Sequence, residues 1–240
     1  MASLEIGLAA RGVDVLSDRP EDWGRFGDVS VWWGYASSNC GGRNLLLEAG
    51  YVNGSSGDYT MDRLRFVSAS WDQLHGRSVA VPTNCPPDRF AALDLAIVPW
   101  RDHGRYTLLL GQHPGDAVAP GLGEWDKVIA ACEEIGNVRV RPHPLVERSR
   151  PLAEDLADAR VAVTWSSTAA IEAVLHGVPV VALDPGCMAW PVASHSLDAP
   201  LYLGDRRQWA YDLAYRQWTH DELSSGEAWD SIWQAGTDTF

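Results

Sequence analysis

The sequence of this 240-residue chain predicts an α/β protein whose C-terminal half is built around a parallel sheet. After residue 104, short apolar runs alternate with helical patterns, as expected for strands joined by helical crossovers. A hydrophobic fraction of 46% suffices for a packed core. The segment PTNCPPDRF, residues 82–90, and the stretch around residues 98–105 predict a joint. We therefore expect two domains, residues 1–103 and 104–240.

In the N-terminal half we expect short strands separated by loops. Apolar and β-branched runs predict strands at residues 28–35, 44–52 and 63–70. Glycine-rich and serine-rich loops lie between them, at residues 37–42 and 53–58.

In the C-terminal half the expected strands and helices alternate. The strands are expected at residues 106–112, 138–142, 160–165 and 178–183. The helices are expected at residues 124–135, 152–157 and 168–176, and two more at 206–218 and 221–235. Because ligands of an open parallel sheet bind beyond the carboxyl ends of its strands, the endings GQHPGD, RPHP, WSST and DPGC should face one crevice.

The ending WSST raises the question of whether it caps a helix or receives a ligand. Trp165, Ser166, Ser167 and Thr168 lie where the chain turns into a helix, so hydroxyls and unpaired N–H groups converge at the positive end of the helix dipole. A cap needs only one hydroxyl, and three together indicate a phosphate site as readily as a cap. Glu172 follows one turn later in an apolar helix, so it either faces solvent or binds a ligand such as a ribose diol.

Two other strand endings carry groups suited to anions. Arg141 and His143 flank a proline on a stiff, extended backbone, where they could contact a diphosphate. The segment GQHPGDAV holds Gln112, His113 and Gly115, which could approach a base or a phosphate closely. It is neither a dinucleotide fingerprint nor a P-loop, and the sequence also lacks the nucleophile elbow and the H-E-x-x-H motif.

Composition limits the remaining classes. Four cysteines without a C-x-x-C pair indicate neither a zinc site nor a disulfide framework. The formal net charge of -13 disfavours a polyanionic partner unless basic residues gather on one face. The N-terminus lacks a basic leader and no apolar run would span a bilayer, so we expect a cytoplasmic protein, in the host cytoplasm if it is phage-encoded.

The four endings, in this order, resemble the C-terminal domain of GT-B glycosyltransferases. The group related to capsular-polysaccharide and Kdo transferases is similar in its R-x-H-P strand end, its S-S-x-x-x-x-E-A helix and its G-x-P-V strand, here residues 141–144, 166–173 and 177–180. The stretches LLLEAGYV, SASWDQLHGR, LLLGQHPGDAV and LAYRQWTHDELSSGEAW resemble a compact phage-type subgroup. The resemblance implies two Rossmann-like domains whose parallel sheets face a central cleft, with a reduced N-terminal domain.

The resemblance also implies a site for a nucleotide-sugar donor, with a UDP-sugar favoured, and no permanently bound cofactor. Ser166, Ser167 and Thr168 would hold the diphosphate, with Trp165 beside them, and Glu172 would hold the ribose. Arg141 and His143 would contact the phosphates or the sugar. Gln112 and the loop that includes His113 and Gly115 would complete the donor pocket.

An inverting transfer needs a base that removes the acceptor proton. The candidates are Glu48, Asp58 and Asp72, and Glu48 is preferred because it follows three leucines and burial can raise the pKa of a carboxyl group. A structural carboxylate bound to backbone N–H groups is the alternative for Glu48. The sequence has no D-x-D pair, so we expect metal-independent chemistry in which N–H groups, Arg141 and His143 meet the leaving-group charge.

The subgroup's association with phages favours a hexosyltransferase whose acceptor is a 5-hydroxymethylated pyrimidine, such as 5-hydroxymethylcytosine, in phage DNA. Arginines crowd the first 90 residues, so a basic cleft could coexist with an acidic exterior. They are Arg11, Arg19, Arg25, Arg43, Arg63, Arg65, Arg77 and Arg89. The alternatives are a polysaccharide or lipid-linked glycan acceptor, a sugar-nucleotide epimerase, and a binding module without turnover.

Overall fold

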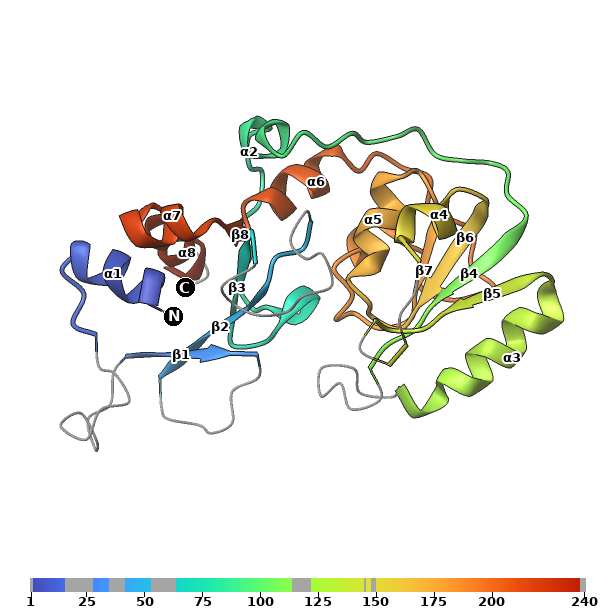
Figure 1. Ribbon diagram of the computed structural model, residues 1–240, viewed down its shortest axis with the longest axis horizontal. Coiled ribbons are helices and arrows are strands. Elements are labelled where there is room, and N and C mark those ends of the chain that lie inside the picture. Colours follow the sequence, from blue (N-terminus) through green and yellow to red (C-terminus); the bar gives the residue numbers. More distant parts are fainter. Residues whose placement is uncertain are drawn as a thin grey trace. The chain divides into compact units, whose positions relative to one another are not determined.

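The computed structural model describes residues 2–15, 28–34, 42–52, 64–113, 122–144, 146–147 and 150–237. The chain divides into two compact units (Figure 1). Unit 1 comprises Met1–Leu74, Ser78–Arg89 and Tyr211–Phe240, and unit 2 comprises His75–Arg77 and Phe90–Ala210. The expected division at residues 103 and 104 differs from this one, chiefly because the last thirty or so residues return to unit 1.

Unit 2 contains the parallel sheet that the sequence predicts. Its strands are β4 (Tyr106–Leu110), β5 (Val138–Arg141), β6 (Ala159–Thr164) and β7 (Val180–Ala182). They lie in the order β5-β4-β6-β7, and each neighbouring pair is parallel. The inner strands β4 and β6 are buried along almost their whole length because helices cover both faces.

Three helices cover this sheet, namely α3 (Trp125–Ile135), α4 (Leu152–Leu156) and α5 (Ala169–Leu175). Residues of α4 and α5 share a buried cluster with Leu108 and Leu110 of β4, whereas Cys132 of α3 packs with Leu109 and Val163. Figure 1 accordingly shows α3 on the face opposite α4 and α5.

The strand order creates one topological switch point. From β4 the chain crosses to β5 on one side and then to β6 on the other side. The loops that follow β4 and β6 therefore diverge from neighbouring strand ends. In open α/β sheets this divergence makes the crevice in which ligands bind.

Unit 1 has a mixed sheet in place of the expected parallel one. Its order is β1 (Val29–Trp33), β2 (Arg43–Ala49), β3 (Val67–Trp71) and β8 (Gln217–Trp218). The β1–β2 pair is parallel, and the β2–β3 and β3–β8 pairs are antiparallel.

The C-terminal segment differs from the two expected helices. It forms α6 (Arg207–Ala214), β8, α7 (His220–Ser225) and α8 (Glu227–Thr237). Gln217 leaves the helical pattern because its buried side chain accepts hydrogen bonds from the backbone N–H groups of Tyr51 (2.7 Å) and Val52 (3.1 Å). Gly226, with a φ of 82°, separates α7 from α8.

Helix α1 (Ala2–Ala10) packs on this returning segment. Leu4 and Leu8 share a buried cluster with Leu223 and Trp229. The two backbones come close at Gly7, where an added Cβ would lie 1.9 Å from the carbonyl oxygen of Leu223. The N-terminal and C-terminal ends of the described chain thus build one helical layer of unit 1.

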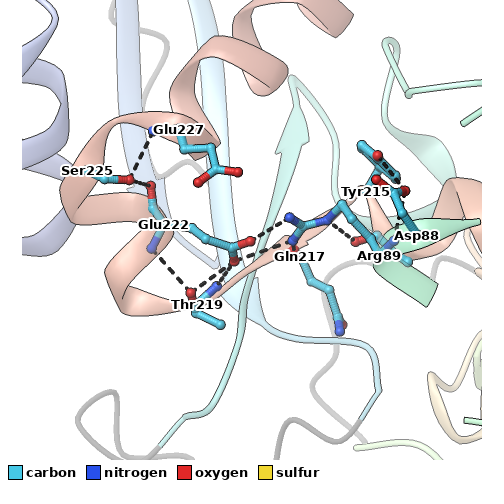
Figure 2. Close-up of polar contacts among 9 residues, drawn as sticks. Asp88, Arg89, Tyr215, Gln217, Thr219, Glu222, Ser225 and Glu227 are labelled. Atoms are coloured by element: carbon cyan, nitrogen blue, oxygen red, sulfur yellow. Dashed lines mark hydrogen bonds and ion pairs between the residues drawn. The ribbon is translucent and has the colours of Figure 1, made fainter. Parts of the chain in front are cut away.

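Arg89 in α2 (Asp88–Ala92) ties the returning segment to the rest of unit 1 (Figure 2). Its guanidinium donates to Glu222 Oε1 at 2.5 Å and to the carbonyl oxygen of Gln217 at 2.9 Å, and it lies 4.1 Å from the ring centroid of Trp218. Glu222 also closes a capping box with Thr219 at the start of α7. This network explains why residues far apart in the sequence form one unit.

Three short 3-10 helices complete the described elements, at His75–Arg77, Leu122–Glu124 and Trp190–Val192. Within the parts of the chain that the structure describes, no helix is both long and apolar enough to cross a membrane.

Candidate functional site

Gln112 and Ser166 meet at the switch point of unit 2. The backbone N–H of Ser166 donates to Gln112 Oε1 at 2.6 Å, and Gln112 Nε2 donates to Ser166 Oγ at 3.0 Å. Ser166 is buried and Gln112 is half-buried. The loops after β4 and β6, both expected near a ligand, are therefore joined by side-chain hydrogen bonds and held in a fixed geometry.

Two of the hydroxyls that follow β6 keep donors for a ligand. Ser167 Oγ accepts from the N–H of Ala169 at 3.3 Å, so its hydroxyl proton can still be donated. The buried Ser166 hydroxyl instead faces Gln112, from which it accepts at 3.0 Å and to which it donates at 3.4 Å. Thr168 is the N-cap residue of α5, and its exposed side chain makes no capping hydrogen bond. The site thus combines three hydroxyls with the start of a helix, as the sequence predicts.

Glu172 lies one turn into α5. Its side chain is exposed, yet the neighbouring protein desolvates it enough to raise its pKa, against the opposing charges of His176 and Arg141. An exposed carboxylate one turn beyond the three hydroxyls can accept hydrogen bonds from a polar ligand.

At the end of β5, Arg141 is bound to the protein itself, which the sequence did not predict. Arg141 is largely buried, and its Nη1 donates to Asp155 Oδ2 at 2.6 Å and to the carbonyl oxygen of Arg150 at 2.7 Å. Nη1 of the guanidinium is therefore committed to the protein. His113 and His143 meet edge to face, with ring centroids 5.9 Å apart, so the endings of β4 and β5 also come together.

Asp155, which holds Arg141, is a site component that the sequence did not single out. Its buried carboxylate also lies 2.5 Å from Arg150 and 3.5 Å from Arg139. Arginines two residues apart on a strand share a face, and this pattern was the available signal that a buried carboxylate opposes them. Asp155 sets the position of the RPHP ending.

An ion pair that the sequence did not predict lies just after the end of β7. Asp184 is buried and receives two hydrogen bonds from Arg77 Nη2, at 2.8 and 2.6 Å. Arg77 comes from the 3-10 helix at His75–Arg77, whose Gly76 N–H donates to the carbonyl oxygen of Gly186 at 3.0 Å. No sequence pattern links the DPGC ending to a segment so much earlier in the chain.

The proposed catalytic carboxylates lie in unit 1. Glu48 is half-buried on β2, and its Oε1 accepts from the N–H of Ala49 at 3.1 Å. Asp72 accepts from the N–H of Asn44 at 2.7 Å and from Arg43 Nε at 3.1 Å, as a structural carboxylate does. Asp58, like Gly115 of the donor loop, falls outside the described residues.

Among the residues that the structure describes, no group of three or more His, Cys, Asp or Glu side chains is placed to hold a metal ion.

Among the solved structures that resemble the chain are two KpsC proteins. "Thermosulfurimonas dismutans KpsC, beta Kdo 2,7 transferase" matches with a TM-score of 0.59 and 13% identity over 99% of this chain and 97% of that chain. "Thermosulfurimonas dismutans KpsC, beta Kdo 2,4 transferase" matches with a TM-score of 0.50 and 15% identity over 78% of this chain and 79% of the other. The chain has a GT-B-like fold. At these identities the likeness shows the fold alone.

The GT-B-like chain also matches a family model described as "Putative glycosyltransferase (DUF6716)" over residues 125–189. This match covers α3 through the turn after β7, and it includes Arg141, Ser166 and Glu172. A search of curated proteins finds no match.

Proposed function

We propose that the chain is a glycosyltransferase that transfers a sugar from a nucleotide-sugar donor held by unit 2. The observation that carries this proposal is the Gln112–Ser166 link at the switch point, with Thr168 and Glu172 directly beyond it. Hydroxyl donors and a helix start suit phosphate, and a carboxylate one turn away suits a ribose diol. The family description of residues 125–189 supports the same activity.

In this proposal the hydroxyls of Ser167 and Thr168 donate to the donor phosphates, and Ser166 holds the loop beside them through Gln112. Glu172 accepts from the ribose hydroxyls. Arg141, positioned by Asp155, directs its remaining N–H groups at the phosphates together with His143. These donors stabilise the negative charge that develops on the leaving nucleotide, which is the role required of a transferase without a metal. Gln112 positions the loop and need not touch the ligand. A UDP-sugar remains the donor to test first.

For the acceptor, we favour a glycan hydroxyl over hydroxymethylated DNA. Four of the eight arginines expected to line a basic cleft are paired with carboxylates, and Arg19, Arg25 and Arg63 fall outside the described residues. In the described part of the chain the pairs are Arg11–Asp230, Arg43–Asp72, Arg77–Asp184 and Arg89–Glu222. The net charge of -13 also disfavours a polyanionic partner. The Kdo transferases with a similar fold also favour a glycan.

Glu48 is the base that we propose for an inverting reaction. Its carboxylate would take the proton of the acceptor hydroxyl while that oxygen bonds to the anomeric carbon and the bond from that carbon to the phosphate breaks. Asp72 suits this role less well, because it forms an ion pair with Arg43.

The test is incubation of the purified chain with UDP-, CMP- and GDP-sugars and one of three partners: a glycan acceptor, hydroxymethylated DNA, or no acceptor. Nucleotide release that requires the glycan, and that is lost in Glu48→Gln, is the expected result. Nucleotide release that requires the DNA would instead identify hydroxymethylated DNA as the acceptor. Isomerisation of the sugar without an acceptor would indicate an epimerase, and binding without turnover would indicate a binding module.

A further inference from the structure

Trp190 and His195 form a flat, stacked pair in unit 2 outside the residues discussed so far. Their ring centroids are 3.6 Å apart and their planes differ by 2°. His195 Nε2 lies 3.0 Å from the carbonyl oxygen of Trp190, and because a carbonyl only accepts, this nitrogen donates. The imidazole is exposed while the indole is partly buried. The second face of the imidazole is thus a rigid aromatic surface open to solvent.

The backbone places this pair at the edge of the sheet that carries the candidate site. Ser194 forms a parallel bridge with Val181 of β7, through hydrogen bonds of 2.9 Å from the N–H of Ala182 to Ser194 O and from the N–H of Ser194 to Val180 O. His195 follows this bridge in the direction of the strands. It therefore lies at the carboxyl end of the sheet, on the same edge as the endings of β4 and β6.

The pair also lies on the face of the sheet that holds α5. Trp190 packs against the buried cluster that includes Ala170 and Ala173 of α5. Between the end of β6 and the bridge at Ser194 lies only β7, so the lateral separation is two strand spacings, roughly 10 Å. This span is of the order that separates a phosphate from the base of the same nucleotide, with Glu172 on the intervening helix.

We propose that the exposed face of His195, backed by Trp190, stacks against the nucleobase of the donor. The inference rests on the proposed function and adds the third part of the nucleotide, after the phosphates at Ser166–Thr168 and the ribose at Glu172. A base has a flat π-face that an imidazole can cover, whereas a hexose offers a puckered ring. Since the imidazole is already fixed by Trp190, stacking on it immobilises no further side chain of the protein.

The test compares His195→Leu with His195→Phe. Leucine covers the Trp190 indole, so a base cannot stack on the indole in place of the imidazole. The branched leucine side chain does not itself offer a flat surface. Phenylalanine keeps a flat ring. Calorimetry measures the binding of UMP, CMP, AMP and GMP, and of ribose 5-phosphate, which lacks the base. His103→Ala, an exposed histidine elsewhere in unit 2, is the matched control.

For the nucleotide that binds tightest to the unmodified protein, His195→Leu should weaken the affinity about tenfold, within the range that base stacking supplies. It should leave the affinity for ribose 5-phosphate unchanged, and His195→Phe should match the unmodified protein. Equal losses for nucleotide and ribose 5-phosphate, or no loss for either, would overturn the base contact and leave the proposed function standing. If the unmodified protein binds neither compound, both proposals fall.

Discussion

Replacing Asp155 by Asn should destabilise unit 2 through a charge effect that can be worked out from its contacts. The Asp155 side chain is 6% exposed and its principal partner Arg141 is 12% exposed, so the substitution leaves a buried guanidinium without its counter-charge. Breaking a pair of this kind costs about 3–5 kcal/mol. Arg139 and Arg150 are 41% and 43% exposed, and solvent screening makes their share small. We expect a loss of about 3 kcal/mol, since the amide of Asn keeps part of the hydrogen bonding.

Urea denaturation followed by tryptophan fluorescence measures this loss. The control is Asp158→Asn, which removes an ion pair with Arg105 whose side chains are 46% and 76% exposed. Exposed pairs of this kind contribute about 0–1 kcal/mol, so the control should be nearly silent. If Asp155→Asn costs no more than the control, the Asp155 carboxylate does not hold the arginines of β5, and its positioning of Arg141 is refuted.

Three further predictions concern single side chains. Glu172→Ala should weaken nucleotide-sugar binding in calorimetry. It should not lower the thermal midpoint, because desolvation raises the pKa of this carboxyl and the folded state therefore gains no stability from its charge. An unchanged affinity would show that Glu172 does not bind the ribose. Arg89→Met should cost about 2–3 kcal/mol in urea denaturation, since it breaks a partly buried ion pair and hydrogen bonds to two carbonyls; a loss below about 1 kcal/mol would contradict this. Burial raises the pKa of Glu222, but Arg89 and Thr219 outweigh it and the net pKa is lowered. The stability that Glu222 adds is therefore present at neutral pH and lost as the pH falls below the unfolded value of about 4.3, so Glu222→Gln should differ from the unmodified protein at pH 7 and converge with it in acid.

The fold of unit 2 was largely predictable from the sequence. Its strands are buried on both faces, so each appears as a short apolar run, and the expected strand at residues 160–165 differs from β6 by one residue at each end. The helices between them carry enough periodicity to be recognised, as α3 does. The local hydrophobic pattern predicts the structure well here, because each strand is followed directly in the sequence by the helix that packs on it.

Unit 1 was less predictable because its elements depend on distant partners. Helical periodicity extended through residues 206–218, but Gln217 and Trp218 pair with β3 and form a strand. The buried Gln217 side chain satisfies the backbone of Tyr51 and Val52, a contact that no local pattern reveals. The same long-range pairing moves the C-terminal residues into unit 1.

The candidate site shows the same division. The serines after β6 and Gln112 after β4 follow from the rule that ligands bind at strand ends, and the structure joins them. Asp155 and the pairing of Arg77 with Asp184 were not predicted, because the partners lie on other elements of the fold. A sequence pattern marks side chains at the ends of strands, but it does not show which charges neutralise them.

The most direct test of the central claim is a crystal structure of the chain with a bound nucleoside diphosphate. We predict density for the phosphates within hydrogen-bonding distance of Ser166–Thr168 and for the ribose beside Glu172. Density for the nucleotide at any other place, or a soaked crystal with none at the ends of β4 and β6, would contradict the account.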